Sequence, residues 1–291
     1  MILDETRAEQ VKYSYTDYDA YLRCLICDSP TLYRRGGIAH WHNDVEFLVT
    51  LAGTAEHNVN GQLFTLHSGE AIFVNARQMH YARPVGEERS EILCIRLSPR
   101  MLCMSPFFES AYLLPVMQNR SMPCLILRED DGWQGEVIRA LNEMYRQSKS
   151  KAAHLKIHGL FCFIWSLLYE NMPESTQEIF SDAADLTSIE AMIGHIEQYY
   201  GEKLTLAQIA EAGHVCESKC CRLFGKYVHK TPNTYLMHYR LGKASELLLT
   251  TELSVTEIAL ACGFSGTSYF SESFRKLFGQ TPLEYRRKKR L

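Results

Sequence analysis

The pattern of hydrophobic and polar residues divides the chain into a β-type part and a helical part. Between residues 33 and 97, short apolar runs alternate with turn-forming residues, and the dipeptide Asn60-Gly61 separates two of these runs. Asn-Gly between apolar runs favours a two-residue β-hairpin, and short runs at regular spacing predict a barrel or a sandwich. We therefore expect an all-β barrel over residues 33–97.

After the expected barrel, the period of the pattern becomes helical. Val137, Leu141 and Met144 recur at helical spacing, and residues 154–169 form a second, more apolar stretch. This pattern predicts an antiparallel helix pair over residues 132–171. The pair can act as a dimer interface or as a cap on the core of the barrel, and the pattern is compatible with both.

A polar segment at residues 172–187 has the composition of a linker. It contains Pro173 and several Ser, Thr and acidic residues, but few large apolar ones. Beyond it, the pattern is helical throughout. We therefore expect two domains, residues 1–171 and residues 188–291, joined by this linker. The length of 291 residues favours the same division, because domains usually contain roughly 100 to 200 residues.

The helical part contains an internal duplication. Residues 204–212 resemble residues 253–261, and the motif Thr-Pro-x-x-Tyr occurs at residues 231–235 and again at residues 281–285. Self-similarity at a fixed offset indicates one supersecondary unit that is present twice.

Each copy has the pattern of a helix-turn-helix unit. It begins with a capping box, at residues 205–208 or 254–257, whose side chains satisfy backbone amides at the start of a helix. The pattern then predicts a short helix, a tight turn and a second helix, within residues 205–227 and 254–278. In such a unit the second helix enters the major groove of double-stranded DNA, so two copies predict contact with two successive grooves.

The second helix of each unit carries the predicted DNA contacts. Apolar residues in both helices have the spacing of a buried stripe, so the residues between them face outward. Guanidinium, hydroxyl and carboxylate groups can bond to base edges, whereas Lys and Arg on phosphates add affinity without reading sequence. The predicted base-facing residues are Glu217, Ser218, Cys221, Arg222, Thr267, Ser268, Ser271 and Glu272. The predicted phosphate contacts are Lys219, Lys226, Arg240, Lys243 and Lys276.

Charge is distributed unevenly along the chain. The formal net charge is −3, but residues 188–291 hold 14 Lys and Arg against 10 Asp and Glu, while the remainder holds 17 against 24. A basic segment beside an acidic one indicates that the C-terminal part is the one that meets a polyanion. The first residues are polar and no run of eighteen apolar residues occurs, so we expect a cytoplasmic protein with no membrane partner.

The second unit has the most distinctive sequence in the chain. It reads Leu253-Ser-Val-Thr-Glu-Ile-Ala-Leu-Ala-Cys-Gly-Phe-Ser, followed by Ser268-Tyr-Phe-Ser and by Phe274-Arg-Lys-Leu-Phe-Gly-Gln-Thr-Pro. With these motifs, residues 188–287 resemble the DNA-binding domain of the AraC/XylS family. The resemblance implies an all-α domain of seven helices in two subdomains, joined by a long helix at about residues 234–250.

Two positions depart from the pattern of that family. Glu272 stands where members often carry a basic residue, which puts the base preference of the second unit in doubt. Cys216 replaces the usual Ser or Thr at the start of a helix, which costs about 1 kcal/mol of capping.

The N-terminal part contains residue types that bind metals. Residues 40–46 read His-Trp-His-Asn-Asp-Val-Glu, and His80 follows later. Side chains two and four residues apart on a strand share one face, so they can converge on one ion. The segment resembles the two motifs of cupin barrels, although residues 75–77, Asn-Ala-Arg, depart from the expected Pro-x-Gly turn. The resemblance implies divalent-metal ligands at His40, His42, Glu46 and His80.

The same residues are also compatible with a pocket that holds no metal. With Trp41 and Arg77 nearby, the face offers hydrogen bonds and stacking to a sugar-like or other small polar effector. No cofactor is certain from the sequence. The predicted effector-pocket residues are His40, Trp41, His42, Glu46, Arg77 and His80.

We interpret the chain as a transcription regulator that binds DNA and responds to a small-molecule effector. The resemblance implies an activator more often than a repressor, and we expect RNA polymerase and a second copy of the chain as further partners. The alternative hypothesis is a cupin metalloenzyme fused to a DNA-binding domain. We favour a protein that is not an enzyme, because the sequence shows no nucleophile elbow and no phosphate-binding glycine loop.

Overall fold

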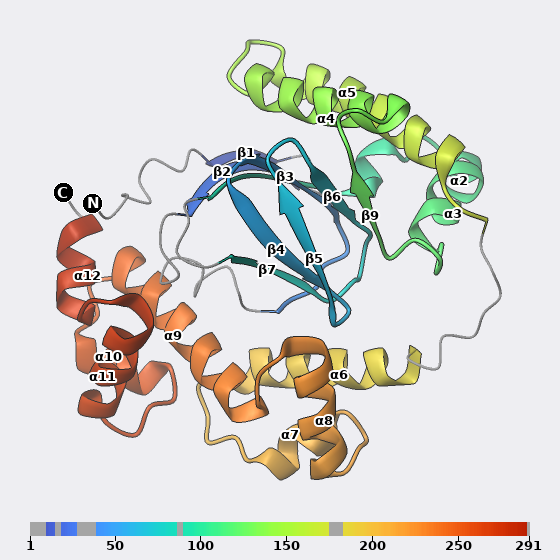
Figure 1. Cartoon of the computed structure of the whole chain (residues 1–291). Coiled ribbons are helices and arrows are strands. Elements are labelled where there is room, and N and C mark those ends of the chain that lie inside the picture. Colours follow the sequence, from blue (N-terminus) through green and yellow to red (C-terminus); the bar gives the residue numbers. More distant parts are fainter. Residues whose placement is uncertain (1–9, 15–18, 28–38, 86–89, 175–182, 290–291) are drawn as a thin grey trace.

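The structure is a computed structural model that describes residues 10–14, 19–27, 39–85, 90–174 and 183–289. Figure 1 shows a β-rich part between two groups of helices. Residues 33–38 of the predicted barrel and residues 175–182 of the predicted linker lie outside the described residues.

Two antiparallel sheets form the β-rich part. The order of the larger sheet is β1 (Gln10–Ser14), β2 (Asp19–Cys27), β8 (Ser90–Leu97), β3 (Val45–Ala52), β6 (Ala71–Val74) and β9 (Cys124–Leu127). The order of the smaller sheet is β5 (Gln62–His67), β4 (Thr54–Val59) and β7 (His80–Pro84). The predicted hairpin at Asn60-Gly61 joins β4 to β5, and both residues have positive φ, of 51° and 88°. The all-β region is larger than predicted, because β1, β2 and β9 lie outside residues 33–97.

Alternation along β3 separates two cores. Phe47 and Val49 pack in a core that contains residues of helices α4 and α5, whereas Leu48 packs with residues of the smaller sheet. Because strand side chains alternate with period two, Glu46 and Thr50 lie on the same side as Leu48, in the space between the sheets. That space therefore holds buried polar groups as well as an apolar core.

Helices cover the outer face of the larger sheet. The predicted helix pair is present as α4 (Gly132–Gln147) and α5 (Ala153–Asn171), and both pack on this sheet as a cap on its core. Short helices connect β8 to β9: η2 (Pro99–Leu102), α2 (Pro106–Phe108), η3 (Glu109–Leu113) and α3 (Leu114–Met117).

All the regular secondary structure described in the C-terminal part is helical. Its seven described helices are α6 (Ala183–Tyr199), α7 (Leu206–Ala212), α8 (Glu217–Val228), α9 (Pro232–Thr250), α10 (Val255–Ala261), α11 (Thr267–Phe278) and α12 (Pro282–Lys289). Helix α6 begins inside the segment that the sequence indicates as a linker. The polar composition of this segment did not indicate a helix. A helix can nevertheless begin there, because a single apolar stripe is enough to hold a helix on its neighbours.

The duplicated units have the predicted internal structure. Both capping boxes are formed, with Thr205 accepting from the amide of Gln208 and Ser254 accepting from the amide of Glu257. Each unit has its own core, one around α6 to α9 and the other around α9 to α12. Helix α9 contributes to both cores, as expected of a long connecting helix.

Candidate functional site

The second helix of each unit presents a polar face to solvent. The predicted buried stripe is confirmed, because Cys220, Leu223 and Phe224 on α8 and Phe270 and Phe274 on α11 are all buried. The predicted base-facing residues lie between them. Exposed among these are Glu217, Ser218, Cys221, Arg222, Ser268 and Glu272, and half-buried are Thr267 and Ser271. Both outer faces thus expose hydrogen-bonding groups to solvent.

The predicted phosphate contacts Lys219, Lys243 and Arg240 form polar interactions within the protein. Lys219 forms an ion pair of 2.8 Å with Asp185, and Lys243 forms one of 3.1 Å with Glu246. The guanidinium of Arg240 donates to the carbonyl oxygens of two residues in the turn after α6, at 2.7 and 2.6 Å. Burial lowers the pKa of Arg240. Arg240 therefore joins α9 to that turn. Lys226 and Lys276 are exposed on α8 and α11, and the ammonium of Lys226 lies 4.9 Å from the centre of the Tyr227 ring.

The start of α8 shows the consequence of Cys216. This residue has the extended backbone of an N-cap, with φ −75° and ψ 159°, but its side chain makes no capping hydrogen bond. The exposed amides at the start of the helix therefore lack the side-chain acceptor that Thr205 and Ser254 provide elsewhere.

Four side chains with metal-binding atoms converge at the edge of the barrel. They belong to two separate segments, and the backbones of His40 and His80 pair through hydrogen bonds of 3.1 and 2.9 Å. Their ligand atoms all lie within 4.8 Å of one another. The structure thus brings together the four residues that the sequence indicates as metal ligands, namely His40, His42, Glu46 and His80.

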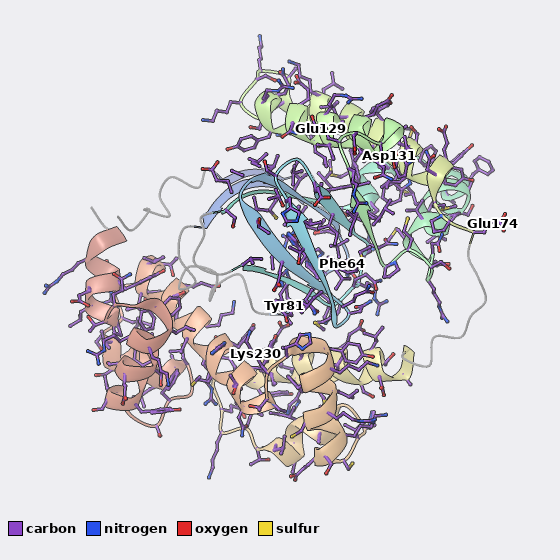
Figure 2. All side chains as sticks on the ribbon, in the orientation of Figure 1. Phe64, Tyr81, Glu129, Asp131, Glu174 and Lys230 are labelled. Carbon is purple, nitrogen blue, oxygen red and sulfur yellow. The ribbon has the colours of Figure 1, made fainter. Side chains whose placement is uncertain are left out.

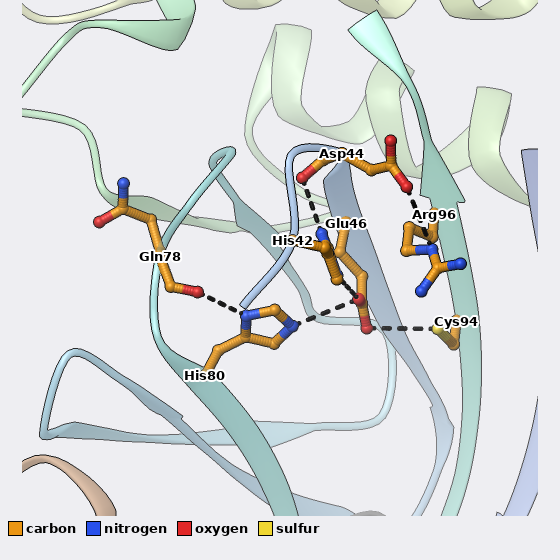
Figure 3. Close-up of polar contacts among 7 residues, drawn as sticks. All are labelled: His42, Asp44, Glu46, Gln78, His80, Cys94 and Arg96. Carbon is orange, nitrogen blue, oxygen red and sulfur yellow. Dashed lines mark hydrogen bonds and ion pairs between the residues drawn. The ribbon is translucent and has the colours of Figure 1, made fainter. Parts of the chain in front are cut away.

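Hydrogen bonds fix the orientation of two of these imidazoles (Figure 3). Nδ1 of His42 lies 3.0 Å from the carbonyl oxygen of Asp44, and Nδ1 of His80 lies 2.8 Å from that of Gln78. Each Nδ1 therefore donates, and each Nε2 points at Oε2 of Glu46, at 2.9 and 3.3 Å. Backbone acceptors on the far nitrogen are the usual way in which proteins orient metal-binding histidines.

The carboxylate at the centre of this group is charged. Burial alone would raise the pKa of Glu46, but the hydrogen bonds from His42 and His80 outweigh burial and hold the pKa well below its usual value. Burial likewise lowers the pKa of His80, whereas the contact with Glu46 raises it more, so the pKa lies above its usual value. Imidazole and carboxylate ligands in this number suit a divalent transition metal.

The space between the sheets holds further buried polar atoms. Both ring nitrogens of His57 and the hydroxyls of Thr50 and Ser90 are buried and have no hydrogen-bond partner among the described residues. Burial lowers the pKa of His57 to about 4. Unpaired buried polar atoms are rare in native proteins and often mark a place where a ligand or water binds.

Two residues of the predicted effector pocket, Trp41 and Arg77, lie on the side of the barrel that contacts the helical part. Trp41 packs against the core of the first helix-turn-helix unit, and the guanidinium of Arg77 lies 5.9 Å from its ring. Arg77 also forms a long ion pair of 3.9 Å with Glu190 on α6. Because neighbouring residues of an extended chain face opposite sides, Trp41 faces away from its neighbours His40 and His42.

The contact between the barrel and the first unit was not predicted from the sequence. Ala39, Met79 and Tyr81 are buried in the same core as residues of α6, α8 and α9. Figure 2 shows Tyr81 and Lys230 on facing sides of this contact, and the ammonium of Lys230 lies 5.6 Å from the ring of Tyr81. One signal in the sequence could have indicated this contact. Met79 and Tyr81 flank His80, and because His80 faces the barrel interior, these two apolar side chains face outward and need a partner.

Comparison with known proteins agrees with both parts of this structure. Residues 209–288 match the family described as Helix-turn-helix domain, and residues 34–96 match the family described as Cupin domain. The resemblance to the AraC/XylS family is therefore supported in both parts of the chain, one of which matches a helix-turn-helix domain and the other a cupin domain. The relatives that match most of the chain are HTH-type transcriptional regulators and activators.

Curated relatives match the chain over most of their length. An uncharacterised HTH-type transcriptional regulator, YdeC of Bacillus subtilis, is 29% identical and covers 85% of this chain and 85% of its own. The HTH-type transcriptional activator RhaS of Pectobacterium carotovorum is 27% identical, with 85% and 86% covered. The melibiose operon regulatory protein of Escherichia coli is 24% identical, with 86% and 83% covered. Among the described helices, none combines the length and the apolar character that crossing a membrane requires.

Proposed function

We propose that this regulator reads two successive major grooves of DNA, with α8 in one and α11 in the other. The observation that carries the proposal is the repetition of one arrangement. In both units a first helix, α7 or α10, begins with a formed capping box, and the second helix, α8 or α11, has a buried stripe that leaves polar side chains exposed. Readout of the major groove needs a helix whose apolar face is fixed on a protein core and whose polar face is open to the DNA bases.

Within this proposal, Arg222 is the strongest candidate for base readout. It is exposed on α8, and a guanidinium can bond to O6 and N7 of guanine with two hydrogen bonds, which discriminates bases by about 1–3 kcal/mol. Lys226 and Lys276 are candidates for phosphate contacts, which add affinity at any sequence.

The barrel is proposed to sense an effector, not to catalyse a reaction. Its polar groups lie between the sheets and at the edge that faces the first unit, where a bound molecule can influence how that unit is held. By analogy with the relatives named as activators, the regulator is proposed to activate transcription together with RNA polymerase. A second copy of the chain remains a predicted partner.

Selection of binding sites from random-sequence DNA tests the proposal. The wild-type chain is expected to enrich one sequence, and Arg222→Ala is expected to weaken binding to it roughly 5- to 150-fold with relaxed preference at one position. Arg146→Ala provides the matched control, since Arg146 is an exposed arginine on α4. A random pool that remains unenriched would contradict the proposal.

A further inference from the structure

The four metal-binding side chains lie directly beside the contact between the barrel and the first helix-turn-helix unit. The carbonyl oxygen of Ala39, next to His40 in the chain, accepts a hydrogen bond of 2.8 Å from the hydroxyl of Tyr235 on α9. Both residues are fully buried. His40 is therefore one peptide bond away from a buried hydrogen bond to the connecting helix.

The second segment of the cluster is joined to the same unit. His80 lies between Met79 and Tyr81, and both of these neighbours are buried among residues of α6, α8 and α9. His80 faces the barrel side, while its two neighbours face the helices. A displacement of His80 along its own strand therefore displaces two side chains inside the core of the first unit, because protein interiors are close-packed.

A third contact lies at the hairpin between β4 and β5. Asn58 bonds through its side-chain amide to Nε2 of His229, which follows α8, at 3.1 Å. A side chain added at Gly61 would meet the carbonyl oxygen of Lys226 at 2.7 Å, so the hairpin and the end of α8 approach closely. Asn60, in the same hairpin, accepts from the backbone amide of Met79 at 3.0 Å. The hairpin thus connects the strand of His80 to the helix that is proposed to read DNA.

The geometry of the cluster demands positive charge at its centre. With each Nδ1 donating to a carbonyl oxygen, the Nε2 atoms of His42 and His80 either donate a proton to the Glu46 carboxylate or, in the neutral rings, carry lone pairs that point at it. Three such lone-pair donors close together repel one another unless protons or a cation lie between them. A metal ion satisfies all of them at once, and His40 supplies a further imidazole within the same 4.8 Å.

We propose that a divalent transition-metal ion bound by His40, His42, Glu46 and His80 is an effector of DNA binding, and that Tyr235, Met79 and Tyr81 transmit its presence to the first helix-turn-helix unit. This inference rests on the proposed DNA-binding function and names the effector class.

A bound ion would fix the spacing between the two segments that carry the ligands, because ligands from both segments would bind the same ion. Ala39, Met79 and Tyr81 are next to these ligands in the chain and are buried against the first unit, so they would report that spacing to its helices. Couplings of this kind change the affinity for a second ligand about 5- to 150-fold, and the effect is reciprocal.

The test measures metal binding and DNA binding separately on the full chain. Co²⁺ absorption reports metal binding, and fluorescence anisotropy reports the affinity for the selected DNA sequence with Zn²⁺ or with a chelator. Three variants are compared with the wild type: His42→Ala removes a ligand, Tyr235→Phe removes the hydroxyl that bonds to Ala39, and Tyr285→Phe is the matched control. Tyr285 occupies the position equivalent to Tyr235 in the second unit, in a core that contains no described barrel residue.

The expected result is a change of at least 5-fold in DNA affinity between the zinc and chelator conditions in the wild type and in Tyr285→Phe. Tyr235→Phe should bind Co²⁺ as the wild type does, but its DNA affinity should change less than 2-fold. His42→Ala should lose the Co²⁺ signal and the zinc effect. Absence of Co²⁺ binding at these residues, or equal DNA affinity with and without Zn²⁺, would overturn the inference and leave the DNA-binding function intact. Failure to bind any DNA sequence in either condition would instead overturn the proposed function, and the metal inference with it.

Discussion

His57 gives a prediction whose size follows from the structure. It lies on β4 inside the barrel, 1% exposed, and neither ring nitrogen has a hydrogen-bond partner among the described residues. Burial lowers its pKa from 6.5 to about 4. The native state therefore keeps His57 neutral at a pH at which the unfolded chain already binds a proton.

The sign of the pH dependence follows from this difference. Between pH 6.5 and about 4 the unfolded state binds more protons at this position, so His57 makes the protein less stable as the pH falls. The full difference corresponds to about 3 kcal/mol of unfolding free energy, since one pKa unit is worth about 1.4 kcal/mol. His57→Leu should remove this loss. The variant should be at least as stable as the wild type at pH 7, and more stable by up to about 3 kcal/mol near pH 4.

Urea unfolding at several pH values, in the presence of a chelator, measures the effect. All three tryptophans of the sequence lie between residues 41 and 165, so tryptophan fluorescence reports the N-terminal part. Phe64→Leu is the matched control, because Phe64 pairs with His57 across β4 and β5 and cannot be protonated. A difference between His57→Leu and the wild type that stays constant from pH 7 to pH 4 would refute the reasoning.

Three further predictions concern the helical part and its contact with the barrel. Cys216→Ser should supply the missing cap of α8 and raise the free energy of unfolding by about 1 kcal/mol, which is measured as a higher Tm. An unchanged Tm would contradict the assignment of residue 216 as the cap. Gly61→Ala should lower stability by roughly 1–2 kcal/mol in a thermal melt, because φ is +88° and the added Cβ meets Lys226; unchanged stability would show that the hairpin does not dock there. Arg240→Ala should destabilise the helical domain by about 2 kcal/mol through its lost carbonyl hydrogen bonds, while the salt dependence of DNA binding stays the same. A shallower salt dependence would instead make Arg240 a phosphate contact.

Local signals predicted the elements of this fold well. The capping boxes, the Asn60-Gly61 hairpin and the buried stripe of α8 each depend on residues within a few positions of one another, and all are present. The convergence of His40 with His80 was also predicted. That prediction came from the resemblance to cupin barrels, which implies that these distant residues lie together, and not from the local sequence pattern.

Long-range contacts explain what the sequence did not predict. Strand β9 pairs with β6 after an intervening group of short helices, and no local pattern marks it as part of the barrel. The hydroxyl of Tyr235 bonds to a carbonyl 196 residues away, and the repeated Thr-Pro-x-x-Tyr motif gives no hint that the two tyrosines have different surroundings. In the sequence, Arg240 cannot be distinguished from other surface cations. Only the structure shows that its guanidinium donates a hydrogen bond to the carbonyl oxygen of Tyr200.

Hydroxyl-radical footprinting of the wild-type chain on its selected DNA sequence tests the central claim most directly. If α8 and α11 read successive major grooves, two protected segments should lie on one face of the DNA, about one helical turn or roughly 10 base pairs apart. Arg222→Ala should weaken protection in one of the two segments. A single protected groove, or two segments on opposite faces of the duplex, would contradict the account.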